Sequence, residues 1–190
     1  MMMQIDSASK ASMSIFDENS LLSRLNRNET DQLDEHIIHC LELSRRVSEV
    51  SGGAYDVTVA PLVTAYGFAG KDREAKVNVD SILEFVGIDK LSISQGRLCK
   101  ADARVQIDFN SIAKGYVVDM AAEALEQLGV EDYLVDIGGE VRCRGVNPKG
   151  SAWRVGVETP FDGNDTPGAF IEQVISLSNC SMATSGNYRR

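Results

Sequence analysis

Lys114 and Gly115 lie where a strand-like segment of the chain gives way to a helical one. Residues 105–109, "VQIDF", alternate apolar and polar side chains, and this alternation predicts a short strand. Apolar side chains recur at helical spacing through residues 113–128, and Gly129 is a typical helix stop. The pattern therefore predicts a strand, a tight loop and a helix, with the lysine in the first turn of that helix.

The start of a helix attracts anions, because its first N–H groups lack partners and carry a partial positive charge. Asn110 or Ser111 is the candidate cap of this helix. Lys114 places a cation where the helix dipole disfavours one, and Gly115 costs about 1 kcal/mol relative to alanine. Both choices favour an external anionic ligand. The alternative is a solvated lysine beside a glycine that only lets the helix pack on a strand.

Composition indicates a soluble globular chain, with 43% apolar and 25% charged residues among 190. This length predicts one domain spanning residues 1–190. A formal charge of −9 argues against nucleic acid as the main partner, since phosphate contacts need clustered Lys and Arg. The chain lacks an apolar run of roughly 18 residues, the length that crosses a membrane. Its start, "MMMQIDSASKASM", lacks the pattern of a secretory signal.

The cysteines are scattered and show neither a C-x-x-C motif nor zinc-ligand spacing, so buried structural thiols are expected. They are Cys40, Cys99, Cys143 and Cys180. His36 and His39 lie close to Cys40 on a predicted helix surface. Because the apolar residues of this segment already explain an amphipathic helix, a metal site is the less favoured interpretation.

The other segments predict an α+β fold in which helices pack on a mostly antiparallel sheet. Residues 29–53 read as a long amphipathic helix, and residues 80–87 as a short one capped by Asp80 or Ser81. Pro61 either breaks a strand or starts a short helix. A hairpin is expected to turn near residues 95–96.

Further strands are expected in "DYLVDI", "EVRCRG", "WRVGVETP" and "FIEQVISLS", the first two joined by Gly138 and Gly139. The sequence contains no Walker loop, no G-x-G-x-x-G fingerprint and no G-x-S-x-G elbow. Any nucleotide is therefore expected to bind in some other way.

Six windows of the chain, in order and across nearly its whole length, together resemble one family. These windows are "MSIFDENSLLSRLN", "GGAYDVTVAPLVTAYGF", "VQIDFNSIAKGYVVD", "YLVDIGGEVRCRG", "WRVGVETP" and "MATSGNYR". They are similar to the FAD:protein FMN transferases, the ApbE-like proteins once described as thiamine-biosynthesis lipoproteins.

The resemblance implies an ApbE-like fold and an enzyme that binds FAD with a divalent metal, usually Mg2+. Such enzymes cleave the diphosphate of FAD, pass the FMN part to a threonine or serine hydroxyl of an acceptor protein, and release AMP. Phosphoryl transfer requires neutralised charge on the phosphate oxygens and an attacking oxygen held in line. Lys114, the helix start and the metal could neutralise that charge.

Residue by residue, the resemblance implies a flavin-nucleotide contact at Asp108, through a ribose hydroxyl or the adenine amino group. A turn-forming or capping aspartate is the alternative. It implies a phosphate contact at Lys114, and a metal ligand at the main-chain carbonyl of Ser111, since magnesium accepts carbonyl oxygen.

Aromatic positions of the family match Phe16, Tyr66 and Phe68, which would offer flat faces to the cofactor. A buried core aromatic is the alternative for Phe16. Gly67 would let the backbone approach the cofactor.

Thr184 and Ser185, with Gly186, match a loop that closes the site. The Gly138–Gly139 pair is expected to be structural, as the turn of a hairpin.

Family members continue past the position of Arg190, first with a histidine-bearing strand and then with an acidic segment that supplies most metal ligands. Residues 1–190 are therefore expected to represent an incomplete flavin transferase domain with weak metal binding and slow turnover. Two alternatives remain: an FAD pyrophosphatase that yields FMN and AMP, and a non-catalytic flavin-binding fragment.

The resemblance also implies a setting in the cell. The acceptor is expected to belong to respiratory electron transport, and the location to be the cell envelope or the periplasmic side of the inner membrane. Membrane attachment would come through a lipoprotein anchor outside these residues.

Overall fold

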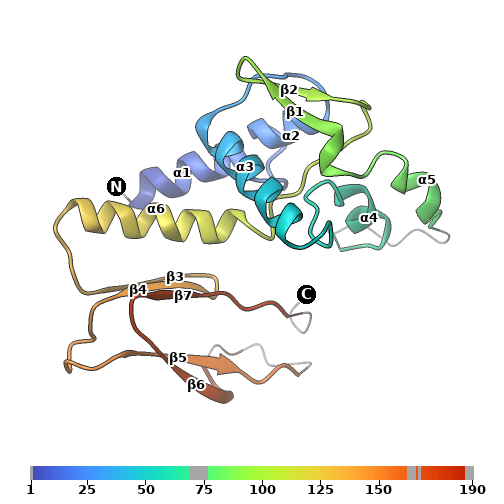
Figure 1. Ribbon diagram of the computed structural model, residues 1–190. Helices are drawn as coiled ribbons and strands as arrows, with labels where there is room; N and C mark the ends of the chain where they lie inside the picture. Colours follow the sequence, from blue (N-terminus) through green and yellow to red (C-terminus); the bar gives the residue numbers. More distant parts are fainter. Residues whose placement is uncertain (1, 69–76, 162–165, 167, 187–190) are drawn as a thin grey trace. The chain divides into compact units, whose positions relative to one another are not determined.

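The computed structural model describes residues 2–68, 77–161, 166 and 168–186, and they form two compact units (Figure 1). One unit comprises Asp6–Ala113, and the other comprises Met1–Ile5 with Lys114–Arg190.

Helices and one hairpin make up the unit Asp6–Ala113. The helices are α1 (Met2–Met13, which starts in the other unit), α2 (Leu21–Asn26), α3 (Glu35–Val50), α4 (Ala60–Ala65), α5 (Val79–Leu83) and the 3-10 turn η1 (Ile88–Lys90). The hairpin joins β1 (Leu91–Ser94) to β2 (Arg97–Lys100), with Gln95 and Gly96 both at positive φ, so the turn lies where the sequence predicts it.

Helices α3 and α5 are both shorter than the predicted ranges of residues 29–53 and 80–87. Helix α3 begins six residues after Glu29, because the Asp34 carboxylate caps it by accepting the Ile37 N–H at 2.8 Å. Helix α5 is capped by neither Asp80 nor Ser81. Asn78 caps it instead, by accepting the Ser81 N–H at 3.2 Å.

Residues 105–109 do not form a strand, which corrects the prediction. Val105, Ile107 and Phe109 are fully buried, so the alternation reflects burial of one side of an extended segment. The segment makes a single bridge, from Gln106 to Val59. The side chain of Asn26 pairs with the backbone of Ile107, donating to its carbonyl and accepting its N–H, both at 2.8 Å, while the Asp108 N–H donates to the Val57 carbonyl.

Strands dominate the other unit, in which every described strand pair is antiparallel. Helix α6 (Ala113–Gln127) precedes a sheet of order β3-β4-β7, and a separate hairpin is formed by β5 and β6. The strands are β3 (Tyr133–Ile137), β4 (Glu140–Arg144), β5 (Trp153–Glu158), β6 (Ile171–Leu177) and β7 (Cys180–Met182). The predicted α+β class with antiparallel sheets is confirmed.

The β3-β4-β7 sheet is covered on both faces (Figure 1). Val118, Ala121 and Ala122 of α6 pack against Tyr133 and Val135 on one face. On the opposite face, Val141 and Cys143 form a core cluster with Leu177, joined by side chains of the β5–β6 hairpin. Side-chain alternation along β4 therefore sends successive residues to two different environments.

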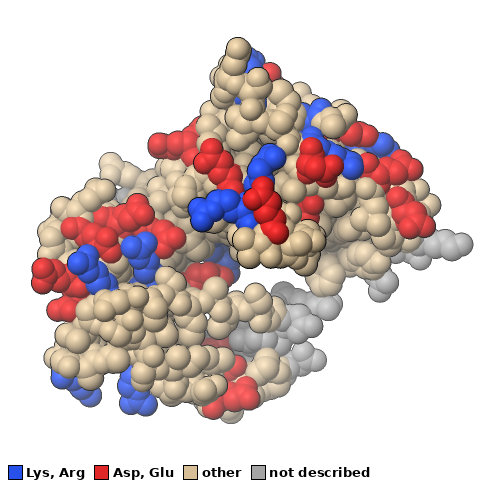
Figure 2. All heavy atoms as spheres, viewed as in Figure 1, with Lys and Arg blue, Asp and Glu red and all other residues tan. Residues whose placement is uncertain are grey.

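Charged side chains of both signs mix over the face shown in Figure 2, where basic residues lie beside acidic ones. Within the described part of the chain, no helix has the length and apolar character needed to cross a bilayer.

Candidate functional site

Asp108 shapes the turn that leads into α6. Asp108 is 8% exposed, and its carboxylate accepts the N–H of Asn110 at 2.7 Å and the Asn110 side-chain amide at 3.3 Å. Burial raises the pKa of the Asp108 carboxyl, and the hydrogen bonds from Asn110 oppose that rise. The turn-forming role considered from the sequence is thus present. A carboxylate has about four acceptor positions, so acceptor capacity remains for a ligand.

Ser111 follows in the same turn and is exposed. Its hydroxyl lies 3.0 Å from the hydroxyl of Tyr55, either of which can donate. The residue directly before α6 is Ile112, and its N–H, like that of Ala113, donates to the Phe109 carbonyl. Neither predicted cap therefore stands directly before the helix, because this backbone turn occupies that position.

The described residues alone do not form a metal-binding site. They contain no group of three or more His, Cys, Asp and Glu side chains arranged to hold an ion. The Ser111 main-chain carbonyl is then a single oxygen, whereas magnesium requires near-octahedral oxygen ligation.

Lys114 lies in the first turn of α6, as predicted, and faces the half-buried acid Glu140. Its Nζ lies 2.9 Å from Glu140 Oε2, with the lysine side chain 51% exposed and the glutamate side chain 16% exposed. Glu140 Oε2 is inaccessible to solvent and has no hydrogen-bond partner of good geometry. The ammonium of Lys114 therefore compensates the charge of the Glu140 carboxylate as an ion pair and not through a well-aligned hydrogen bond. An ammonium has three N–H donors, which leaves directions open toward solvent or a ligand.

The Gly138–Gly139 turn lies against this ion pair. Both glycines have positive φ, +62° and +94°, as the tight turn between β3 and β4 requires. A Cβ added to Gly138 would meet Lys114 Cδ at 3.6 Å, and one added to Gly139 would meet Thr184 Oγ1 at 3.3 Å. The glycines thus have the predicted structural role. Gly139 also leaves room for the Thr184 hydroxyl, whereas Lys114 lies at an ordinary van der Waals distance from Gly138. We call Lys114, Gly138, Gly139, Glu140 and Thr184 the lysine cluster.

Gly115 has no packing reason within the described residues. A Cβ placed on it would meet no heavy atom within 4 Å, so α6 does not need a glycine here to approach a strand. This finding removes the packing alternative considered from the sequence. A poor helix former in a helical turn with open space beside it suits the approach of an external group.

The aromatic candidates are surface residues of the unit Asp6–Ala113. Phe16 is 76% exposed, so the alternative of a core aromatic is wrong for it. Tyr66 and Phe68 are also exposed, at the C-terminal end of α4. Between them Gly67, at φ +80°, ends that helix while the Phe68 N–H donates to the Val63 carbonyl at 2.9 Å. Gly67 therefore has a local structural cause.

Thr184 and Ser185 lie just after β7 and are exposed. The structure brings Thr184 to the two-glycine turn beside Lys114, and Ser185 follows it in the same segment. Phe16, Tyr66 and Phe68 lie on two other loops in the unit that also holds Asp108.

Glu140 is the residue that sequence reasoning missed. It follows the two glycines directly, and as the register partner of Ile137 it lies on the α6 side of the sheet. A charged residue on the helix-facing side of a hairpin was the available signal. Tyr55 was also missed, since only the folded chain brings it to Ser111.

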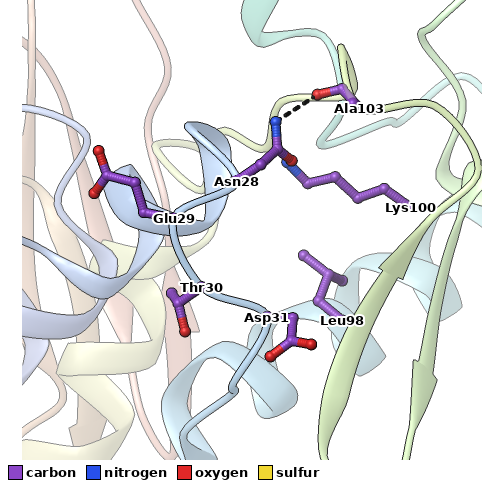
Figure 3. Close-up of a pocket in the computed structure, with 7 residues that line it drawn as sticks. All are labelled: Asn28, Glu29, Thr30, Asp31, Leu98, Lys100 and Ala103. Atoms are coloured by element: carbon purple, nitrogen blue, oxygen red, sulfur yellow. Dashed lines mark hydrogen bonds between the residues drawn. The ribbon is translucent and has the colours of Figure 1, made fainter.

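The unit Asp6–Ala113 has a separate cavity of about 490 Å3 (Figure 3). It is lined by Asn28, Glu29, Thr30, Asp31, Leu98, Lys100 and Ala103. Lys100 Nζ donates to the Leu25 carbonyl at 2.7 Å and to Asn28 Oδ1 at 2.9 Å, while the Asn28 amide donates to the Ala103 carbonyl. The lysine thus ties the end of α2 to β2, which is a structural role.

Lys100 makes the stability of the fold depend on pH. Burial lowers its pKa to about 8, whereas an unfolded lysine titrates near about 10.4. Between these values the unfolded chain binds more protons, so the free energy of unfolding is expected to rise as the pH rises from about 8 to about 10. Urea unfolding of wild type and Lys100→Met at several pH values tests this. Lys100→Met should lose the rise, and the exposed-site control Lys149→Met should keep it; equal slopes in all three proteins would contradict the assignment.

Comparison with known proteins places these features in a family context. Residues 3–190 match the model of the ApbE family. An FAD:protein FMN transferase of Haemophilus influenzae is 38% identical over 191 residues, covering 94% of this chain and 54% of that protein. The chain therefore spans about half the length of this curated relative.

Solved structures give the same result for the fold. The Pseudomonas stutzeri flavinyl transferase ApbE, in its apo form, has a TM-score of 0.85 at 31% identity, covering all of this chain and 60% of that one. The flavin transferase ApbE of Vibrio cholerae has a TM-score of 0.82 at 31% identity, covering all of this chain and 62% of that one. The ApbE-like fold expected from the sequence is confirmed.

Proposed function

The chain belongs to the ApbE family, and from this premise we propose that it transfers the FMN part of FAD to a threonine or serine hydroxyl of an acceptor protein. In this reaction the acceptor oxygen attacks the flavin-side phosphorus of the diphosphate. The bond from that phosphorus to the bridging oxygen breaks, AMP leaves with the bridging oxygen, and the hydroxyl proton passes to a base or to solvent.

The lysine cluster is the observation that carries this proposal. Negative charge on the diphosphate must be neutralised as the bond breaks, and a preorganised cation does so at low cost in reorganisation. The half-buried carboxylate of Glu140 holds the Lys114 ammonium beside a backbone that has no side chains at Gly138 and Gly139. A half-exposed lysine next to a turn without side chains leaves room for a phosphate group to approach its ammonium.

The remaining residues predicted from the sequence would bind FAD without taking part in the bond change. Asp108 would accept a hydrogen bond from a ribose hydroxyl or the adenine amino group, and Phe16, Tyr66 and Phe68 would offer flat apolar faces to a ring. Thr184, with Ser185, would cover the phosphates from the segment after β7. Magnesium remains part of the proposal through the family resemblance. When bound it would neutralise phosphate charge, with the Ser111 carbonyl as one ligand.

A second candidate is hydrolysis of FAD to FMN and AMP, with water in place of the acceptor hydroxyl. The exposure of half of the Lys114 side chain favours it, because water has access to the same position. Both candidates use the same diphosphate chemistry.

The experiment that tests the proposal incubates the protein with FAD and MgCl2, with and without an acceptor protein. We expect AMP to form only with the acceptor, together with flavin fluorescence that stays on the denatured acceptor. AMP and free FMN in the absence of acceptor would favour hydrolysis. Retained FAD without any AMP would contradict both and favour a flavin-binding protein without catalysis.

Gly115→Ala provides a test of ligand approach. Alanine should raise the free energy of unfolding by about 0.5–1 kcal/mol, because glycine is the poorer helix former and the added Cβ meets no atom. It should also weaken FAD binding, measured by flavin fluorescence, because the methyl group takes space beside Lys114. Gly129→Ala is the matched control at the other end of α6, where φ is +79° and alanine should destabilise the fold. A stabilised Gly115→Ala protein with unchanged FAD affinity would contradict the role given to this glycine.

The cellular setting is a further proposal from the family resemblance. The acceptor is proposed to be a protein of respiratory electron transport, and the location the cell envelope or periplasm. Cell fractionation followed by a search for covalently flavinylated proteins in a deletion strain tests both.

A further inference from the structure

Two cysteines face each other across adjacent strands of the β3-β4-β7 sheet. Cys143 of β4 and Cys180 of β7 are direct register partners in an antiparallel pair. Directly opposed residues have their side chains on the same face, with Cα atoms about 4.5 or 5.5 Å apart depending on the hydrogen-bond pattern. Disulfides span Cα separations of about 4.4–6.8 Å, so either pattern is compatible with a bond.

Both cysteines are free thiols in the structure, and the thiol of Cys143 contacts the backbone of Cys180. Cys143 Sγ lies 3.4 Å from the Cys180 carbonyl oxygen, as its weak donor. Cys143 is buried, and Cys180 is exposed, which corrects the prediction of buried thiols for Cys180 as it does for Cys99. The exposed thiol of Cys180, on the outer strand β7, is the member of the pair that a small oxidant can reach.

The other cysteines are not arranged in this way. Cys99 is exposed on β2 and has Ser92 as its register partner. Cys40 is buried, and desolvation, with a smaller effect of Asp34, raises the pKa of its thiol to about 12, which keeps it protonated and unreactive.

We propose that Cys143 and Cys180 are a redox-active pair that forms a cross-strand disulfide and fastens β7 to β4. With a glutathione-type disulfide as oxidant, the exposed Cys180 thiolate attacks one sulfur and releases the first glutathione thiolate. The Cys143 thiolate then attacks Cys180 Sγ in the mixed disulfide and releases the second. Two protein thiols are oxidised, one external disulfide is reduced, and the two thiol protons end on the two glutathione molecules.

The bond has a consequence for the lysine cluster. Strand β4 begins at Glu140, and β7 ends two residues before Thr184. Fastening the two strands therefore limits movement of the Thr184 segment away from the two-glycine turn. This consequence rests on the proposed function, whereas formation of the disulfide does not.

The test counts thiols in the denatured protein before and after exposure to oxidised glutathione. We expect a fall from four free thiols to two, a cross-linked peptide that joins Cys143 to Cys180, and a Tm higher by several degrees, since the bond closes a long loop. The control Cys99→Ser should form the same cross-link. Cys180→Ser, which alters an exposed residue, should show neither cross-link nor Tm shift.

Two results would overturn the proposal. One is that four thiols remain after oxidation, and the other is that glutathione stays on Cys180 without a link to Cys143. Because these readouts need no FAD, a protein that forms the disulfide but releases no AMP would contradict the proposed function alone.

Discussion

Replacement of Lys114 by methionine is expected to lower AMP release from FAD by about 100-fold or more. Loss of one preorganised charge at a reacting centre typically costs about 10²–10³-fold in rate. Methionine keeps much of the apolar stem and removes the ammonium that lies 2.9 Å from Glu140 Oε2. Lys149→Met, which changes an exposed lysine of the same unit, is the matched control and should keep wild-type activity.

A double variant separates the two effects of this substitution. Lys114→Met also leaves the Glu140 carboxylate buried without a compensating charge, and this should destabilise the fold. Glu140→Gln removes that charge, so Lys114→Met/Glu140→Gln should recover stability in urea without recovering AMP release. Recovery of both together would show that the lysine serves the fold alone. Unchanged AMP release in Lys114→Met would contradict the account of the site.

Phe109→Ala is expected to lower the free energy of unfolding by about 3–5 kcal/mol, as truncation of a buried phenylalanine does. Phe109 is fully buried, and its carbonyl accepts the N–H groups of Ile112 and Ala113 in the turn before α6. A cavity at this position removes the anchor of that turn. Equilibrium denaturation measures the effect directly.

The matched control is Phe16→Ala, which truncates the same side chain at a site that is 76% exposed. Its stability should stay within about 0.5 kcal/mol of wild type. If Phe16 stacks on the cofactor, FAD affinity should fall severalfold, since an aromatic contact contributes about 0.5–1.5 kcal/mol. A large loss of stability in Phe16→Ala, or none in Phe109→Ala, would contradict the burial of these residues.

Local signals in the sequence predict the elements that local interactions stabilise. The helical spacing of residues 113–128 predicts α6 to within one residue, and Gly138 with Gly139 predicts the β3–β4 turn, because positive φ at two positions strongly favours glycine. Residues 105–109 show the limit of this reasoning. Their alternation is that of a strand, but the partner that satisfies Ile107 is the side chain of Asn26, 81 residues away.

The candidate site could be predicted only in part for the same reason. Lys114 and Gly115 conflict with local helix stability, and such conflicts are visible in a sequence. Glu140 is an unusual charge on the helix-facing side of a hairpin, but its partner is a lysine 26 positions earlier in the chain, which no local pattern identifies. The pairing of Cys143 with Cys180 depends on the register of β7, which no local pattern specifies.

Hydrogen–deuterium exchange with and without FAD tests the central claim most directly. We predict that FAD slows exchange in two segments, residues 108–116 and residues 136–141, and leaves the cavity lined by Asn28 and Lys100 unchanged. Slower exchange around that cavity, with no change in the two segments, would show that FAD binds elsewhere and would contradict the claim.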